Sequence, residues 1–237
     1  MAISLTEIVK APYGIYGMMI VLSHDDNTAR WRHGDFDQVR EIGVMRQWLK
    51  EATEPVFLDV GAHAGLFCFG LQDLCHMVHA WEPQRIVFNI LAGNIALNSW
   101  MNVWPHWEAL GEHCGQIPMP TYDYTKTSNF GGIEFGEKFQ PHGGIVGQEP
   151  LEWNGEMVPI RTIDSYNFEK VDVIKIDAEG MELPVLRGGV ATLHRYYPKL
   201  MIEHVKVGID NLIRWLRPEG YTNFEDLGGD LAAWRGK

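Results

Sequence analysis

The strongest constraint on the fold of this chain is a short apolar run followed by two glycines. Residues 56–60 are apolar except for Asp59, and Gly61 and Gly65 follow within five positions. Residues 66–77 then carry apolar side chains at helical spacing. This order predicts a buried strand, a tight turn and a helix. A helix N-terminus at such a turn presents unpaired backbone N–H groups, so the unit is a candidate ligand cradle.

The length and charge of the chain limit the classes of protein to which it can belong. The chain has 237 residues, 46% of them hydrophobic, and a formal net charge of -11. We expect one domain over residues 1–237, with an N-terminal lead-in at 1–55 and an insertion at 111–160. The negative charge argues against nucleic acid as a partner, since phosphate binding depends on clustered Lys and Arg.

Neither the N-terminal residues nor the cysteine content of the chain indicates export. The N-terminus lacks a basic region followed by an apolar core, and no apolar run approaches the ~20 residues that cross a bilayer. The three cysteines form no metal-binding spacing, which is typical of a reducing compartment. We therefore expect a cytoplasmic protein with no membrane partner, either a monomer or a homodimer.

Strand and helix patterns alternate along most of the chain. This alternation predicts an α/β, Rossmann-like fold, with a mostly parallel sheet, helices on both faces and an antiparallel C-terminal hairpin. Strands are expected at 56–60, 77–81, 102–110, 171–177 and 199–205, helices at 66–77, 85–99, 181–193 and 208–216, and the closing hairpin at 221–234.

The lead-in and the insertion are less regular. In the lead-in we expect a strand at 15–22, a loop at 23–28, a solvated loop at 30–33 and a helix at 37–52 capped by Asp35 or Asp37. The insertion is rich in glycine, proline and aromatic residues. It is either a cover over a small-molecule pocket or a β-hairpin that extends the sheet, and the two interpretations are compatible.

The glycine turn departs from the dinucleotide-binding pattern Gly-x-Gly-x-x-Gly. His63 stands where that pattern has its middle glycine, the one that lets a pyrophosphate lie against the backbone. Glu82 ends the next expected strand, 21 positions after Gly61, where a carboxylate can accept hydrogen bonds from two ribose hydroxyls. The two features together indicate a nucleoside ligand without a pyrophosphate.

Three sequence blocks in this order resemble the signature blocks of FkbM-type methyltransferases, a class I family. The blocks are Phe57-Leu58-Asp59-Val60-Gly61-Ala62-His63-Ala64-Gly65, His79-Ala80-Trp81-Glu82-Pro83 and Val173-Ile174-Lys175-Ile176-Asp177-Ala178-Glu179-Gly180-Met181-Glu182. The resemblance covers about residues 56–205. It implies a seven-stranded sheet and methyl transfer from S-adenosylmethionine, usually to a hydroxyl oxygen. His63 departs from the family pattern, which commonly has Asn.

The resemblance also implies roles for individual residues. Asp59 would approach the methionine amino group, Glu82 would hold the ribose hydroxyls, and Pro83 and Gln84 would flank the adenine. The full expected cofactor set is Asp59, Gly61, Ala62, His63, Gly65, Glu82, Pro83, Gln84, Glu108, Ala109 and Asp177. The expected substrate residues in the insertion are Tyr124, Asn129 and Phe130.

The fourth expected strand carries a lysine and an acid on the same side. Lys175 and Asp177 have the same parity, so they face one side of the sheet. Lys175 is then either a base or half of a structural ion pair. The candidate catalytic residues are Asp177, Lys175, Glu179 and His204. A divalent metal at these strand ends is possible, but none is predicted.

The sequence therefore predicts an S-adenosylmethionine-dependent O-methyltransferase. Its partner would be a small hydroxylated substrate, such as a sugar or a secondary metabolite. Two alternatives remain open: a nicotinamide-dependent oxidoreductase, and a non-catalytic cofactor-binding module on the same fold.

Overall fold

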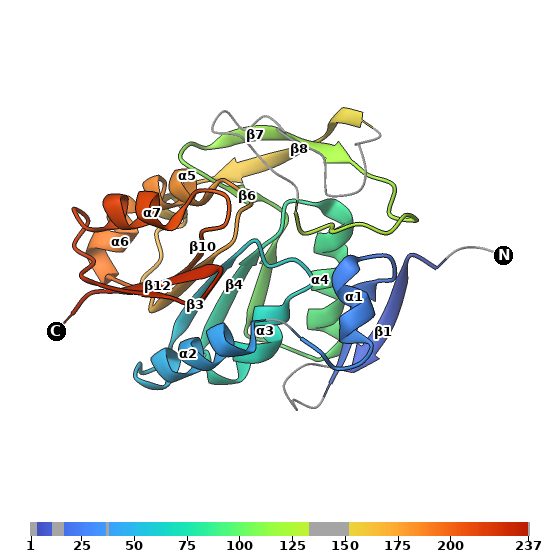
Figure 1. Cartoon of the computed structure of the whole chain (residues 1–237), viewed down its shortest axis with the longest axis horizontal. Helices are drawn as coiled ribbons and strands as arrows, with labels where there is room; N and C mark the ends of the chain where they lie inside the picture. The colour runs from blue at the N-terminus through green and yellow to red at the C-terminus, as the bar shows by residue number, and fades with distance from the viewer. Residues whose placement is uncertain (1–3, 11–16, 37, 133–151, 237) are drawn as a thin grey trace.

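A seven-stranded sheet forms the centre of the molecule. The computed structural model describes residues 4–10, 17–36, 38–132 and 152–236. The strand order is β11-β12-β10-β9-β3-β4-β5, with all neighbours parallel except those of β12 (Figure 1). The strands are β3 (Val56–Val60), β4 (Met77–Trp81), β5 (Val103–His106), β9 (Val173–Ile176), β10 (Lys199–Glu203), β11 (Asn223–Asp226) and β12 (Asp230–Trp234). The expected sheet and its antiparallel C-terminal hairpin are confirmed.

Helices cover both faces of this sheet because the alternate side chains of its strands enter two separate cores. All five residues of β3 are buried. Phe57 packs in one core, and Leu58 and Val60 in the other. The first core is covered by α2 (Val39–Lys50), α3 (Leu66–Leu71) and α4 (Arg85–Leu97), and the second by α5 (Glu182–Arg187), α6 (Val190–Tyr196) and α7 (Ile209–Leu216).

A second sheet of three strands lies above the central one in Figure 1. It contains β6 (Ala109–Leu110), β7 (Gly115–Thr121) and β8 (Glu152–Arg161), in the order β6-β8-β7. The strand expected at 102–110 is therefore wrong in its second half, because the chain leaves the central sheet after His106 and β6 pairs with β8. The insertion does form a hairpin, but this hairpin belongs to the separate sheet. Residues 133–151 lie outside the described part.

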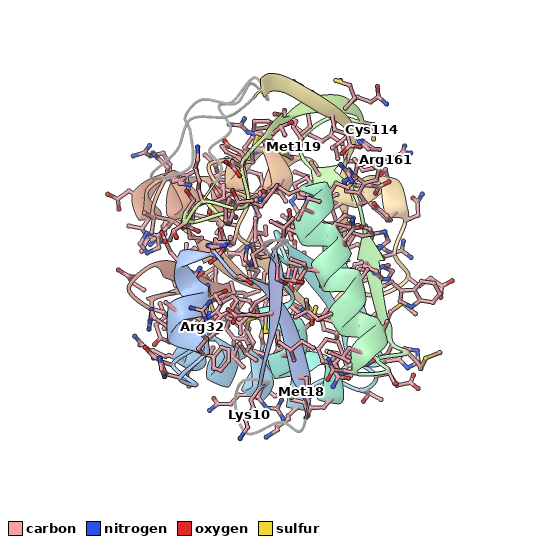
Figure 2. All side chains as sticks on the ribbon, turned by 90° about the vertical axis from the view of Figure 1, so that its right-hand side faces the viewer. Lys10, Met18, Arg32, Cys114, Met119 and Arg161 are labelled. Carbon is pink, nitrogen blue, oxygen red and sulfur yellow. The ribbon has the colours of Figure 1, made fainter. Side chains whose placement is uncertain are left out.

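The N-terminal lead-in packs as a hairpin against α4. Its strands are β1 (Thr6–Lys10) and β2 (Met18–Leu22), of which only β2 was expected. The buried amide of Asn94 on α4 accepts from the backbone N–H of Ile20 at 2.6 Å and donates to its carbonyl at 3.0 Å. Figure 2 views the molecule from this side, with Lys10 and Met18 near the lower end of the hairpin.

The stretch after this hairpin differs from the expected loops. A helix, α1 (Asp26–Trp31), begins inside the segment 23–28, because the Asp25 side chain accepts from the Asn27 N–H and caps it. The solvated loop expected at 30–33 is therefore wrong in its first half, because Arg30 and Trp31 belong to α1 and Trp31 is only 5% exposed, whereas Arg32 and His33 are exposed.

Helix α2 has no acidic cap. Its N-cap is Gln38, in the left-handed region and without a side-chain cap hydrogen bond. Asp35 instead pairs with Arg30, and Asp37 lies outside the described residues.

Two other helices end where glycine or a tighter turn interrupts them. Helix α3 stops at Leu71 and continues as a 3-10 turn, η1 (Gln72–Leu74), rather than reaching residue 77. The expected helix at 181–193 divides into α5 and α6 at Gly188-Gly189. A second 3-10 turn, η2 (Ile163–Tyr166), follows β8. None of the helices in the described ranges is long and apolar enough to cross a membrane.

Gly61 is required by both its backbone conformation and its surroundings. Its φ is +75°, in the left-handed region. A Cβ at this position would overlap the carbonyl oxygen of Asp177. The turn after β3 and the turn after β9 therefore touch through a glycine.

Gly61→Ala should destabilise the protein far more than Gly34→Ala. Gly34 has the same φ of +75° but no atom within 4 Å of where the alanine methyl would lie, so it controls for backbone strain alone. We expect the Gly61 variant to lose at least about 2 kcal/mol more, from overpacking added to strain. Urea unfolding of the two variants measures the difference, and equal losses would contradict this packing.

Candidate functional site

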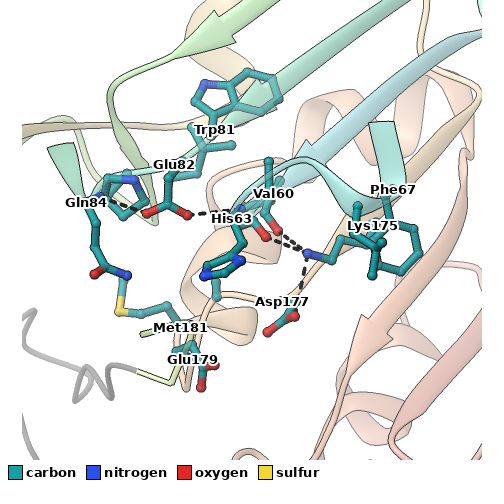
Figure 3. A pocket seen from close by; sticks show the side chains of 18 of the residues that line it. Val60, His63, Phe67, Trp81, Glu82, Gln84, Lys175, Asp177, Glu179 and Met181 are labelled. Carbon is teal, nitrogen blue, oxygen red and sulfur yellow. Dashed lines mark hydrogen bonds and ion pairs between the residues drawn. The ribbon is translucent and has the colours of Figure 1, made fainter. Parts of the chain in front are cut away.

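A cavity of about 230 Å³ opens at the carboxyl ends of β3, β4 and β9 (Figure 3), and residues of β6 and β7 from the three-stranded sheet also line it. Open α/β sheets bind ligands at this edge. Most of the expected site residues line it: Gly61, Ala62, His63, Glu82, Pro83, Gln84, Glu108, Ala109, Asn129, Lys175, Asp177 and Glu179. Five expected residues are not among the lining residues: Asp59, Gly65, Tyr124, Phe130 and His204.

The turn after β3, which carries His63, is held by backbone hydrogen bonds to the end of β4. The N–H groups of Gly61 and Ala62 donate to the Trp81 carbonyl at 3.1 and 2.9 Å. His63 adopts a φ of +50°, and its N–H donates to Glu82 Oε2 at 3.1 Å. The turn is thereby tied to the end of β4.

Glu82 is held in one orientation at the cavity wall. Its second oxygen, Oε1, accepts from the Gln84 N–H at 2.8 Å, and the residue is 4% exposed. Burial raises the pKa of this carboxyl, while His63 and the two backbone N–H bonds oppose the rise. Gln84 in turn donates to the Phe130 carbonyl at 2.6 Å and accepts from Tyr124 at 3.2 Å. Tyr124 and Phe130, which were expected to bind substrate, therefore hold Gln84 in place and do not line the cavity.

Lys175 is a buried ammonium shared among several partners. Its Nζ lies 3.6 Å from Asp59 and 3.6 Å from Asp177, and it donates to the carbonyl oxygens of Val60 and Gly61 at 3.3 and 2.6 Å. Burial lowers the pKa of Lys175, but the charges of Asp177 and Asp59 outweigh it and raise the net value. A lysine held protonated in this way favours the structural interpretation over the base. Asp59 is fully buried beside Lys175 and is not among the residues that line the cavity.

Three carboxylates, Asp177 among them, lie close together at the ends of β9 and β10. Ligand oxygens of Asp177, Glu179 and Glu203 lie within 4.8 Å of one another, close enough to hold a divalent cation. Burial, together with the negative charges of Asp177, Glu182 and Asp230, raises the pKa of Glu203 to about 8. Lys206 already forms an ion pair with Glu179.

His204 does not join this group. β10 ends at Glu203, and His204 just after it points its Nε2 to Asp226 at 3.2 Å, so Glu203 and His204 do not share a site.

Sequence reasoning missed one wall of the cavity. Asn27 and Trp31 of α1, and Gln38 before α2, line it from the lead-in. An isolated bridge between Asp25 and Ser128 joins this lead-in to the insertion. The only local signal was Trp31, a large aromatic residue in a polar stretch. The spacing of apolar residues does not by itself place such a residue at a site.

The charged side chains that line the cavity are mostly negative. Within the described residues, the lining contains four carboxylates and one lysine, namely Glu82, Glu108, Asp177 and Glu179 against Lys175. The charge of Lys175 is directed at backbone carbonyls. Among these carboxylates, Glu108 has a cation nearby, with Arg161 at 3.7 Å. This lining suits a ligand that carries positive charge and gives little to a pyrophosphate.

Comparison with known proteins identifies the family. The model of the methyltransferase FkbM domain matches residues 59–222. This chain belongs to the FkbM methyltransferase family. No protein in the curated set matches this chain.

Solved structures share the fold at low identity. A methyltransferase FkbM from Methylobacillus flagellatus KT is 18% identical with a TM-score of 0.54, over 76% of this chain and 43% of that one. The present chain therefore spans less than half of that protein. A Streptococcus mutans protein described as a candidate methyltransferase, solved in complex with SAH, is 10% identical with a TM-score of 0.50, over 82% and 97% of the chains.

A third solved structure also shares the fold at low identity. A candidate caffeoyl-CoA O-methyltransferase from Staphylococcus aureus is 13% identical with a TM-score of 0.50, and 83% of each chain is covered. At these identities the likeness concerns the fold alone.

Lys175→Met should destabilise the protein strongly, because it leaves Asp59 buried without its cation. We expect a loss of about 3–5 kcal/mol in the free energy of unfolding, the usual cost of breaking a buried pair. The double variant Lys175→Met, Asp59→Asn should recover part of that loss. Urea unfolding tests both; a single variant no less stable than the double would show that the pair does not hold this region.

Glu203→Gln should remove a pH-dependent loss of stability. The ordinary glutamate pKa is 4.5 and that of folded Glu203 is about 8, so the folded state binds more protons over this interval. The free energy of unfolding of the parent protein therefore falls as pH rises between these values, and the variant should lack that contribution. Urea midpoints across this range measure it. Glu225→Gln, an exposed carboxylate paired with Arg40, is the control and should change nothing of this kind.

Proposed function

We propose that this protein transfers a methyl group from S-adenosylmethionine to a hydroxyl oxygen of a small molecule such as a sugar or secondary metabolite. The observation that carries the proposal is the carboxylate-rich cavity at the glycine turn, with Glu82 fixed at the end of β4. S-Adenosylmethionine has a sulfonium and an amino group but no phosphate, so it matches this lining.

The residues present fit this cofactor. Glu82 would receive the ribose hydroxyls, since its carboxylate lines the cavity and is oriented by two backbone N–H groups. Asp177 would take the amino group, because it lines the cavity next to the turn. The apolar side chains of Leu110, Ile117 and Met119 would cover the adenine end and exclude water from it.

The cofactor supplies the activated methyl group, so the protein's work is alignment and proton removal. The acceptor would enter beside the wall from the lead-in and the insertion. Asn27, Gln38 and Asn129 offer amide groups there, and Trp31 an indole. Amides that donate and accept hydrogen bonds, together with an aromatic ring, suit a hydroxylated molecule. Membership of the family supports methyl transfer, while the choice of oxygen as acceptor atom rests on this lining.

A nicotinamide dinucleotide is less compatible with the same cavity. Its pyrophosphate would meet four carboxylates, and the side chain of His63 stands where a close approach needs glycine.

Glu82→Gln should weaken binding of S-adenosylmethionine by roughly 10- to 100-fold, because hydrogen bonds to a charged group contribute about 1.5–3 kcal/mol. Calorimetric titration with S-adenosylmethionine measures this, with the melting temperature checked for each variant. Glu156→Gln is the matched control, since Glu156 pairs with Arg85 and does not line the cavity. Parent protein that binds NADH instead of S-adenosylmethionine would overturn the proposal.

A further inference from the structure

A buried carboxylate from the lead-in faces the ring of His63. Asp25 Oδ2 lies 3.5 Å from His63 Nε2, and Asp25 is 3% exposed. The other Asp25 oxygen caps α1 through the Asn27 N–H at 2.9 Å. Among the described residues, neither Asp25 Oδ2 nor His63 Nε2 forms a hydrogen bond of good geometry with another group, and the backbone N–H of Phe130 also stabilises the Asp25 carboxylate. The two atoms are therefore each other's natural partners.

This pairing determines which ring nitrogen is available. An ionised carboxylate only accepts hydrogen bonds, so it selects the tautomer of His63 that carries its proton on Nε2. Nδ1 then keeps a lone pair. The His63 side chain is 21% exposed and lines the cavity, and Figure 3 shows its ring between Glu82 and Glu179. A carboxylate that orients a histidine so that its other nitrogen can take a proton is a recurring catalytic arrangement.

Other contacts restrict the ring and set its charge. Trp31 packs edge-on against it, with centroids 6.3 Å apart and planes at 69°. Burial lowers the pKa of His63, but the hydrogen bond and charge of Asp25 and the charge of Glu82 outweigh it. Lys175, from β9, opposes the rise. The net pKa is raised above 6.5, which makes the ring a stronger base than a free imidazole.

The other candidate bases are less suited. Lys175 is protonated and bonded to two backbone carbonyls, and Asp177 lies 3.6 Å from that ammonium. Glu179 is paired with Lys206. By contrast with these three residues, His63 is paired with Asp25 through Nε2 only, so its Nδ1 is left to accept a proton.

We propose that His63, oriented by Asp25, is the general base for the acceptor hydroxyl. This inference rests on the proposed function. The acceptor's O–H proton passes to His63 Nδ1 while its oxygen forms the bond to the methyl carbon. The electron pair of the breaking carbon–sulfur bond stays on sulfur, the donor leaves as the neutral thioether, and His63 later releases the proton to solvent.

The first test observes the ring directly and needs no acceptor. Nitrogen-15 NMR of the protein with S-adenosylhomocysteine bound, assigned by comparison with His63→Asn, reports which nitrogen is protonated. We expect the neutral ring to carry its proton on Nε2 and to titrate above the ordinary histidine pKa. Asp25→Asn, which retains a good helix cap, should lower the His63 pKa. A neutral ring protonated on Nδ1, or a pKa that Asp25→Asn leaves unchanged, would overturn the inference.

The second test measures transfer to catechol and methyl glucoside with radiolabelled S-adenosylmethionine. His63→Asn should keep donor binding within about threefold, because Asn tolerates the positive φ, and should lower kcat about 10²–10⁴-fold. Since the base must be neutral, the acid side of the pH profile follows the His63 pKa, and Asp25→Asn should move it to lower pH.

The outcomes of the two tests separate the two proposals. Absence of donor binding, or donor binding without transfer to either probe, would contradict the proposed function and with it the inference. Transfer that His63→Asn leaves at the parent rate would overturn the inference alone.

Discussion

The buried ammonium of Lys175 is the interaction on which the site depends. It lies between Asp59 and Asp177 and binds the carbonyl oxygens of Val60 and Gly61, so one charge links the ends of β3 and β9. A buried charge is tolerated only when its partners are in place, so this arrangement fixes the relative positions of the two turns. The backbone of Gly61 also lies close to the Asp177 carbonyl at this junction.

The cavity is built by two groups of segments with different origins. The ends of β3, β4 and β9 supply the glycine turn, Glu82 and Asp177, which suit a nucleoside with a positive centre. The lead-in and the insertion supply the opposite wall, and the Asp25–Ser128 bridge joins them. In the proposed reaction, the sheet holds the donor, and the added segments select the acceptor and orient its base.

The sequence was sufficient for the sheet and for most of the cavity lining at its strand ends, because both depend on local patterns. The apolar period of β3, the glycine turn and the acid after β4 can each be read within a few residues. The wall of the cavity that comes from the lead-in could not be predicted from such local patterns. Asp25 and Trp31 reach His63 only through tertiary packing, and Asp59, expected in the cofactor set, is buried beside Lys175 and is not among the lining residues. The chain's departure to β6 likewise depended on pairing with β8, which is distant in sequence.

A structure of the protein with S-adenosylhomocysteine bound tests the central claim most directly. The account predicts the nucleoside in this cavity, with its ribose hydroxyls at hydrogen-bond distance from Glu82 and its sulfur facing the wall that holds His63. A ligand bound elsewhere, or bound here with its ribose away from Glu82, would contradict the assignment of this cavity as the methyl-donor site.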